Sequence, residues 1–358
     1  MPEPPNQPDL TRTLTVGMRV VLRHRLDGGL TDALGPLVSA DDTTLVVQTR
    51  RGRVTVARVD VVAAKEVPPA TVRRGAPHLA PSMADLQELM VAGMPPLRSE
   101  WLGRWLLREA SGYTGRANSV LPLGDPGVPL SDALAFVASW YADRGGAPLL
   151  QVYGPSGFSV ADDAVGGAAI DAGWTAFQRT LVMTGSVDAL AVGGGSSTAT
   201  VADRPDDAWW SGAAPREQEH RATATAIFDQ IPDAAYLTLR ADAIRPEVSG
   251  GADAIRPEVT AGDVVAVGRT AFAHAWAGVL SVHVPPAYRR RGLARQVMTL
   301  AAREARARGI RSMYLQVSQD NTAAVRLYES LGFAIHHEYY YLRAPAAPRA
   351  ARAARAPR

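Results

Sequence analysis

Three consecutive arginines stand directly before a glycine and a predicted helix in the stretch YRRRGLARQV, residues 288–297. Their side chains could form a basic patch for nucleic acid, or the backbone of the turn could bind a phosphate. A strand predicted over 276–284 ends just before this stretch, and a helix begins near Leu293. The first N–H groups of a helix lack intrahelical partners, and the helix dipole is positive there. The turn is therefore suited to a phosphate or pyrophosphate.

Small residues keep this turn open to a ligand. Gly292 allows the backbone to come close to phosphate oxygens, and Ala294 adds little bulk. The arginines around them could then neutralise phosphate charge. Further along the chain, a predicted strand (314–317) leads into NTAAVRLYESLGF (321–333), which is predicted to form a helix closed by Gly332.

Together these two motifs resemble the GNAT superfamily of acyl-CoA-dependent N-acyltransferases. Arg289-x-x-Gly292-x-Ala294 matches the Arg/Gln-x-x-Gly-x-Gly/Ala pyrophosphate loop of that superfamily. The segment from Asn321 to LYESLGF matches its second motif. The order and spacing of the two motifs make the match specific.

The resemblance implies acetyl-CoA as the co-substrate and a role for each matching residue. Strand backbone at 282–284 would bind the pantetheine arm, and the turn would bind the pyrophosphate. Tyr328 would be the general acid that protonates the departing thiolate, and helix packing against the sheet is the alternative for this residue. The cofactor-binding residues implied in this way are Val282, His283, Val284, Arg289, Arg290, Arg291, Gly292, Leu293, Ala294, Arg295 and Asn321.

The general base stays open, because the sequence departs here from the common pattern of the superfamily. Many members carry a glutamate on the strand before the loop, whereas WAGVLSVHV (276–284) has none. Ser281 and His283 would point to one face if the strand were regular, and a histidine has a suitable pKa for a base. His283 is the favoured candidate. A structural role for it, and a water relay through Ser281 or a backbone carbonyl, are the alternatives. Three residues of the final predicted strand could reach the acceptor pocket: Glu338, Tyr339 and Tyr341.

The composition narrows the chemistry further. The chain of 358 residues has no cysteine, which excludes disulfides, thiolate–metal sites and a cysteine nucleophile. The acyl group must therefore pass directly from donor to acceptor or use another nucleophile. We expect direct transfer and no metal cofactor. The formal net charge is +3 at pH 7, and five arginines lie in residues 343–358. Without these five, 33 of the 38 basic residues remain against 35 acidic ones, a net charge of −2. The basic character therefore belongs to the tail rather than to the body of the protein.

The N-terminal part is predicted to be all-β. After a disordered leader (1–13), residues 14–67 contain four or five short predicted strands separated by turn signals. This pattern resembles a small SH3- or Tudor-like β-barrel. A proline-rich linker (68–82) follows.

Alternating helix and strand patterns fill the rest of the chain. Residues 198–343 predict the catalytic GNAT domain, an α/β (α+β) fold with a mixed twisted sheet and helices on both faces. Residues 83–195 show the same order of predicted strands and helices but have no phosphate loop. We interpret them as a degenerate GNAT-like half, and an unrelated α/β domain is the alternative. The tandem repeat at 241–262 is interpreted as a duplicated hairpin loop, and 344–358 as a disordered basic tail. The whole arrangement resembles a group of tandem GNAT proteins of actinobacteria.

These observations predict an acyltransferase that moves an acetyl group from acetyl-CoA directly to a primary amine of a small molecule or amino acid. The alternatives are a non-catalytic recruitment protein that uses the barrel and the tail, and aminoacyl-tRNA-dependent transfer on the same fold. We expect a monomer or homodimer with a small-molecule amine acceptor, no membrane partner, and nucleic acid only through a tail contact. No apolar run is long enough to span a bilayer, and MPEPPNQPDL is neither a signal nor a transit peptide, so a cytoplasmic protein is expected.

Overall fold

The computed structural model describes residues 14, 18–26, 28–49, 52–67, 77–190, 198–241 and 262–345. The chain divides into two compact units, Met1–Gly75 and Ala76–Arg358. Several predicted segments lie wholly or mostly outside the described residues: the leader, the proline-rich linker, the glycine-rich break near 192–198, the tandem repeat and the basic tail.

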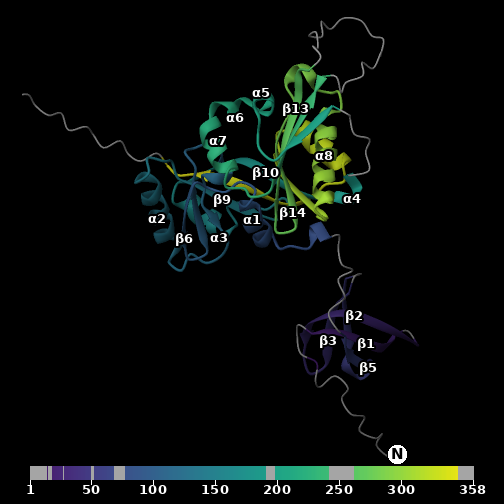
Figure 1. Ribbon diagram of the computed structural model, residues 1–358. Coiled ribbons are helices and arrows are strands. Elements are labelled where there is room, and N and C mark those ends of the chain that lie inside the picture. Colours follow the sequence, from purple (N-terminus) through teal and green to yellow (C-terminus); the bar gives the residue numbers. More distant parts are fainter. Residues whose placement is uncertain are drawn as a thin grey trace, which may run out of the picture. The chain divides into compact units, whose positions relative to one another are not determined.

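The first unit is a five-stranded antiparallel sheet in the order β4-β3-β2-β1-β5 (Figure 1). Its strands are β1 (Arg19–Leu26), β2 (Gly29–Ala40), β3 (Thr44–Thr49), β4 (Gly52–Ala57) and β5 (Val61–Glu66). Gly28, with a φ of 79°, makes the tight connection between β1 and β2. Alternate strand residues point to one side and form a buried core of Val20, Leu22, Ala33, Leu37, Leu45, Val47 and Val56. The expected all-β domain is thus confirmed.

The second unit is built on an eight-stranded sheet in the order β11-β12-β13-β14-β15-β10-β16-β9. The strands are β9 (Leu149–Gly154), β10 (Thr175–Ser186), β11 (Ala199–Ala202), β12 (Ala234–Arg240), β13 (Val264–Ala273), β14 (Trp276–His283), β15 (Ser312–Ser318) and β16 (Ala334–Arg343). All neighbours in this sheet are antiparallel except β14 and β15, which are parallel. A parallel pair needs a long crossover, which α8 (Leu293–Ala307) provides here.

Strands from the two predicted α/β regions share this sheet. β10 comes from the earlier region and lies between β15 and β16 of the later one, and β9 pairs with the other edge of β16. Residues 180–185 of β10 are all buried, as expected for a central strand that is covered on both faces. The sheet is therefore continuous only when both regions are present.

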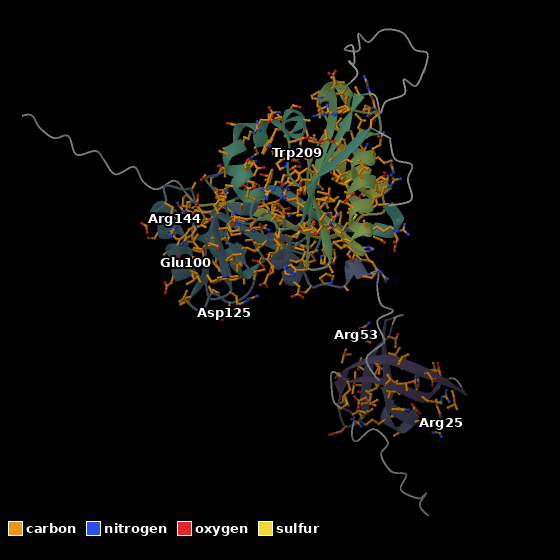
Figure 2. All side chains as sticks on the ribbon, in the orientation of Figure 1. Arg25, Arg53, Glu100, Asp125, Arg144 and Trp209 are labelled. Atoms are coloured by element: carbon orange, nitrogen blue, oxygen red, sulfur yellow. The ribbon has the colours of Figure 1, made fainter. Side chains whose placement is uncertain are left out.

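Helices cover both faces of the sheet (Figure 1). α8 packs on one face through residues at the spacing of an amphipathic helix: Leu293, Val297, Met298, Ala301, Ala302 and Ala305. α5 (Asp207–Gly212) and α7 (Arg221–Phe228) pack on the other face. There Trp209 (Figure 2) is fully buried, and its indole N–H donates a 2.9 Å hydrogen bond to the carbonyl of Gly268. This layered mixed sheet confirms the predicted fold class.

The second unit also contains elements outside the large sheet. They are the small sheet of β6 (Arg98–Leu102), β7 (Trp105–Glu109) and β8 (Leu121–Pro122), the helices α1 (Met83–Val91), α2 (Leu130–Ala142), α3 (Ala164–Asp171), α4 (Val187–Leu190), α6 (Pro215–Glu219) and α9 (Thr322–Ser330), and the 3-10 turns η3 (Gly115–Ala117) and η5 (Pro286–Tyr288). The helix predicted from Asn321 to Gly332 is confirmed as α9. Within the described residues, no helix is both long and apolar enough to cross a membrane.

Candidate active site

A β-bulge interrupts β14 beside its parallel neighbour. The β13–β14 register pairs Val267 with His283 but Arg269 with Leu280, so β14 holds one more residue than β13 over this interval. Ser281 lies inside the bulge with a φ of 52°. A bulge bends its strand and leaves some backbone groups without a ladder partner, so these groups can serve a ligand instead.

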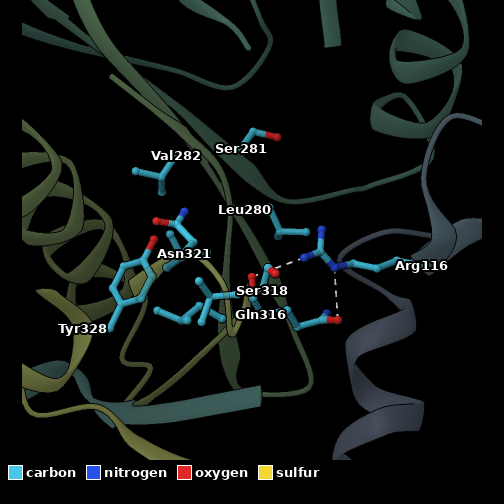
Figure 3. Close-up of a pocket in the computed structure, with 11 residues that line it drawn as sticks. Arg116, Leu280, Ser281, Val282, Gln316, Ser318, Asn321 and Tyr328 are labelled. Atoms are coloured by element: carbon cyan, nitrogen blue, oxygen red, sulfur yellow. Dashed lines mark hydrogen bonds between the residues drawn. The ribbon is translucent and has the colours of Figure 1, made fainter. Parts of the chain in front are cut away.

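A cavity of about 200 Å³ lies where the two parallel strands stop pairing (Figure 3). The pairing of β14 with β15 ends at Val279 and Leu315. The lining residues are Arg116, Val279, Leu280, Ser281, Val282, Leu315, Gln316, Val317, Ser318, Asn321 and Tyr328. Of the residues predicted for the site, the fold therefore brings Ser281, Val282, Asn321 and Tyr328 together around one cavity.

The turn before α8 leaves the start of that helix open. Gly292 is the N-cap residue with a φ of 73°, and no side chain of the described residues caps the first turn. A Cβ atom at Gly292 would meet no heavy atom within 4 Å, so the backbone here faces free space. The helix that follows is 15 residues long. Its unpaired N–H groups and positive dipole end form a surface that can bind an anion.

The arginines of the turn do not all point toward this surface. Three of them contact other parts of the protein: the Nε of Arg289 donates to the carbonyl of Val284 (3.1 Å), Arg291 lies 5.8 Å from the ring centre of Tyr288, and Arg295 donates to the hydroxyl of Ser330 (2.8 Å). Arg290 makes no side-chain hydrogen bond or ion pair to the described residues and has a φ of 61°. Backbone N–H groups are therefore the main ligands that this turn offers, and the side chains of Arg290 and Arg291 make no ion pair with the described residues. The other two residues named for the turn, Leu293 and Ala294, are buried and half-buried, so they offer backbone rather than side-chain contacts.

Asn321 joins the cavity to the start of α9. Its side-chain oxygen accepts a 3.2 Å hydrogen bond from the N–H of Ala324 and so caps the helix. Because the oxygen is used in this way, the amide nitrogen remains as a donor for a ligand in the cavity. The local sequence thus fixes both the beginning of the helix and the orientation of one polar lining group.

Tyr328 lies on α9 with its hydroxyl toward the cavity and Asn321 (Figure 3). Its ring is 9% exposed and packs against Phe333, with 6.1 Å between ring centres. Burial raises the pKa of Tyr328 to about 12, although the charge of Arg116 opposes the shift. The phenol is therefore neutral near pH 7, and it can donate a proton but cannot act as a base.

The bulge changes the relation between Ser281 and His283. The sequence predicts that both side chains point to one face of the sheet if the strand is regular. The strand is not regular, because the bulge shifts the alternation of side chains between the two faces. Val279 and Val282, three residues apart, pack in the same cluster. Ser281 lines the cavity, whereas the Nδ1 of His283 donates a 2.9 Å hydrogen bond to the carbonyl of Gly212 on α5. A carbonyl only accepts, so Nδ1 carries a proton in this contact.

Arg116 and Gln316 are among the seven lining residues that were not predicted from the sequence. Arg116 belongs to η3 in the earlier α/β region, and its Nε donates to the side-chain oxygen of Gln316 at 3.1 Å, as Figure 3 shows. Its Nη2 donates to the backbone carbonyl of the same residue at 3.2 Å. An arginine two hundred residues away in sequence carries no local signal for this site. A tertiary contact was needed to find it.

The polar residues of the final strand separate into two groups. Glu338 is fully buried, forms an ion pair with Arg179, and accepts a 3.1 Å hydrogen bond from the N–H of Gly157. This carboxylate thus holds structure together. Tyr339 and Tyr341 instead line a second cavity that also contains Arg116.

Comparisons with known proteins agree with this geometry. Residues 83–342 match the family described as "Probable histone acetyltransferase Rv0428c C-terminal", and residues 14–65 match "Rv0428c N-terminal Sm-like domain". A protein of Mycobacterium tuberculosis strain H37Rv named "Probable histone acetyltransferase Rv0428c" is 28% identical over 340 residues, which are 92% of this chain and 95% of that protein. The "[Ribosomal protein bS18]-alanine N-acetyltransferase" of Escherichia coli K12 is 39% identical over 67 residues, 18% of this chain and 45% of that one.

A solved structure supports the fold. The "GCN5-related N-acetyltransferase from Kribbella flavida" superposes with a TM-score of 0.50 over 74% of this chain and 96% of its own, at 17% identity. The mixed sheet with one parallel, splayed strand pair defines a GNAT N-acetyltransferase, and the small β domain before it is Sm-like. Within that class, the chain belongs to the family of Rv0428c-like acetyltransferases.

Proposed function

We propose that this protein transfers an acetyl group from acetyl-CoA directly to a primary amine of a small molecule or amino acid, with Tyr328 as the general acid. One observation carries the proposal. An open, uncapped helix N-terminus at Gly292 follows the same bulged strand whose cavity contains the hydroxyl of Tyr328. A pyrophosphate and a thioester at opposite ends of one ligand fit this pair of features.

The residues present fit coenzyme A. The N–H groups at 293–295 can donate to pyrophosphate oxygens, and the uncovered space at Gly292 lets the phosphates reach them. Arg290 and Arg291 can neutralise charge from the rim. The unpaired backbone of the bulge at 281–282 can bind the amide groups of the pantetheine arm, and the amide nitrogen of Asn321 can donate from the facing side.

Two protons move during the transfer: one is added to the departing sulfur, and one is lost from the amine. The nitrogen of a neutral amine forms the new bond to the acetyl carbon, and the carbon–sulfur bond breaks. Tyr328 gives its proton to the sulfur, and the amine gives up one proton to solvent, from which the phenolate is reprotonated. Proton count and charge therefore balance over one turnover.

The lining of the cavity limits how the amine loses its proton. No carboxylate and no histidine lines it within the described residues, and Ser281 is the hydroxyl nearest the bulge. We propose that the acceptor enters as the neutral amine, or loses its proton through water held by Ser281, and that His283 keeps its structural bond to Gly212.

A protein amine is the second candidate acceptor. The names of relatives favour it, since one refers to a histone and another to the alanine of a ribosomal protein. We favour a small acceptor because the second cavity that contains Arg116, beside the one assigned to the donor, has a volume of about 270 Å³, which suits a group the size of an amino acid. Acetylation of free amino acids and of peptides with the same first residue, measured side by side, separates the two candidates.

Acetyl-CoA binding tests the core of the proposal. Gly292→Asp places a carboxylate where the pyrophosphate would lie and should weaken binding by about 100-fold or more, since it removes charge-assisted hydrogen bonds worth about 1.5–3 kcal/mol each. Gly309→Asp is the matched control, because Gly309 also has a positive φ (71°) and free space around a Cβ atom, but lies beyond the other end of α8. Isothermal titration of both variants measures the dissociation constants. Equal affinity in the two variants would refute the assignment of the turn.

A further inference from the structure

A second cavity of about 270 Å³ lies beside the first, with Arg116 in the lining of both. Its other lining residues come from several distant segments: Thr114, Gly115, Leu149, Phe177, Gln178, Arg216, Tyr339, Tyr341 and Arg343. Residues of both α/β regions therefore build it, and none of them carries a negative charge.

Three guanidinium groups line this cavity. The Nε of Arg216 donates to the carbonyl of Tyr113 at 2.6 Å, and Arg343 lies 4.6 Å from the ring centre of Phe177. Arg116 is held by Gln316. Among the described residues, none of the three has a carboxylate at ion-pair distance, although other arginines of the unit do. Three cations without an anion around one hollow give it a strongly positive potential.

Two tyrosines that are linked to Gln316 also line this cavity. The hydroxyl of Tyr339 donates to the side-chain oxygen of Gln316 at 2.9 Å, so the hydroxyl of Tyr341, 3.4 Å away, donates to Tyr339. This order leaves the oxygen of Tyr341 as a hydrogen-bond acceptor. Gly115 makes the wall close-fitting, since a Cβ there would come within 2.6 Å of the Tyr341 ring.

We propose that this second cavity is the acceptor site and that it takes an amine that also carries a carboxylate, with the carboxylate between Arg216 and Arg343. The proposal rests on the acetyl transfer proposed above. A guanidinium pairs with a carboxylate through two parallel hydrogen bonds, and a site with three such groups repels purely cationic amines such as polyamines. The neutral amine end of the acceptor extends past Arg116 and Gln316 toward Ser281 and Tyr328.

The lining also explains how the acceptor could be oriented. Arg116 is held by two hydrogen bonds to Gln316 and lines both cavities, so its guanidinium is a fixed positive charge along the path of the acceptor. Arg216 and Arg343 are exposed on the outer side, where an incoming carboxylate meets them first. The nitrogen–carbon bond then forms, the carbon–sulfur bond breaks, and the protons move as described for the proposed function.

Matched acceptors test this proposal in the full-length protein. Initial rates are measured for a panel of free L-amino acids and for the corresponding amino-acid amides, at saturating acetyl-CoA. The amine of an amide is the less basic one, so ionisation alone would favour the amide. We expect KM at least tenfold lower for the free acids. We also expect Arg343→Gln and Arg216→Gln to raise KM for the acids about tenfold and to leave KM for the amides unchanged. Arg306→Gln, an exposed arginine of α8, is the control.

The outcomes separate this inference from the proposed function. Amides acetylated as well as acids, or unchanged KM in both arginine variants, would overturn the carboxylate site while acetyl transfer stands. Acetyl-CoA binding without acetylation of any amino acid would also overturn it and would direct attention to protein amines. Absence of acetyl-CoA binding would instead remove the proposed function itself. Thermal melting of each variant and titration with acetyl-CoA confirm that the variants are folded and bind the donor.

Discussion

Replacing Tyr328 with phenylalanine isolates the proton that the proposed mechanism assigns to this residue. The hydroxyl makes no hydrogen bond to the described residues, so its removal leaves no buried partner unsatisfied. The ring, which is buried and packs on Phe333, is retained. We therefore expect a change in unfolding free energy within about 0.5 kcal/mol. Any large loss of activity then reports chemistry rather than folding.

The size of that loss follows from the acidity of the phenol. General acids contribute about 10²- to 10⁴-fold to rate. Burial raises the pKa of Tyr328 to about 12, whereas a thiol has a pKa of about 8.5, so the phenol is the weaker acid of the two. Such an acid helps mainly while charge develops on sulfur. We therefore expect the lower end of the range, a decrease in kcat of about 100-fold, or about 2.7 kcal/mol.

Single-turnover acetylation is the appropriate assay, because slow product release can hide a change in the chemical step. Affinity for acetyl-CoA should stay within about twofold, since the lost group acts in the transition state. Tyr340→Phe is the control: this tyrosine lies on β16, packs against Phe158, and lines neither of the two cavities. A Tyr328→Phe variant that retained more than half of the single-turnover rate would refute the general-acid role.

Two further predictions follow from the cavity linings and the sheet order. No carboxylate or histidine lines either cavity in the described residues, and burial raises the pKa of Tyr328 to about 12. We therefore expect kcat/KM to rise with pH along the ionisation of the acceptor's own amine and to show no decline up to about pH 10. An ascending limb that stays at the same pH for acceptors with different amine pKa values would point to a base on the protein instead. A fragment of residues 198–358 lacks β10 and should show no cooperative thermal unfolding, whereas a fragment of residues 76–358, which is a compact unit, should unfold cooperatively. A cooperative transition of the shorter fragment with a melting temperature within about 5 °C of that of the longer one would contradict this prediction.

The parts of the site that the sequence predicted are those encoded by short-range patterns. Gly292 and Asn321 are the N-cap residues of two successive helices. Both could be recognised in the sequence because a cap determines the backbone conformation only of the few residues next to it. The spacing from Asn321 to Tyr328 places both at the cavity because one helix joins them. The fold class followed for the same reason, since alternating helix and strand patterns are local.

The parts that the sequence did not predict depend on pairing between distant segments. Nothing in the pattern of β10 indicates that it lies between β15 and β16, because a buried strand is equally apolar in any central position. The bulge at Ser281 is a property of the register between two strands, so the regular alternation assumed for Ser281 and His283 failed. Arg116 could be placed at the site only once β10 had joined the two regions.

This shared sheet gives the earlier α/β region a physical role although it lacks a phosphate loop of its own. β10 supplies the neighbour that both β15 and β16 need, and η3 supplies Arg116, which holds Gln316 of β15. Gln316 in turn accepts from Tyr339 of β16. The hydrogen bonds that link the first cavity with the second cavity therefore run through all three segments. A region that has no phosphate loop can in this way position groups that line both cavities, and under the proposed function the acceptor preference should therefore depend on both regions.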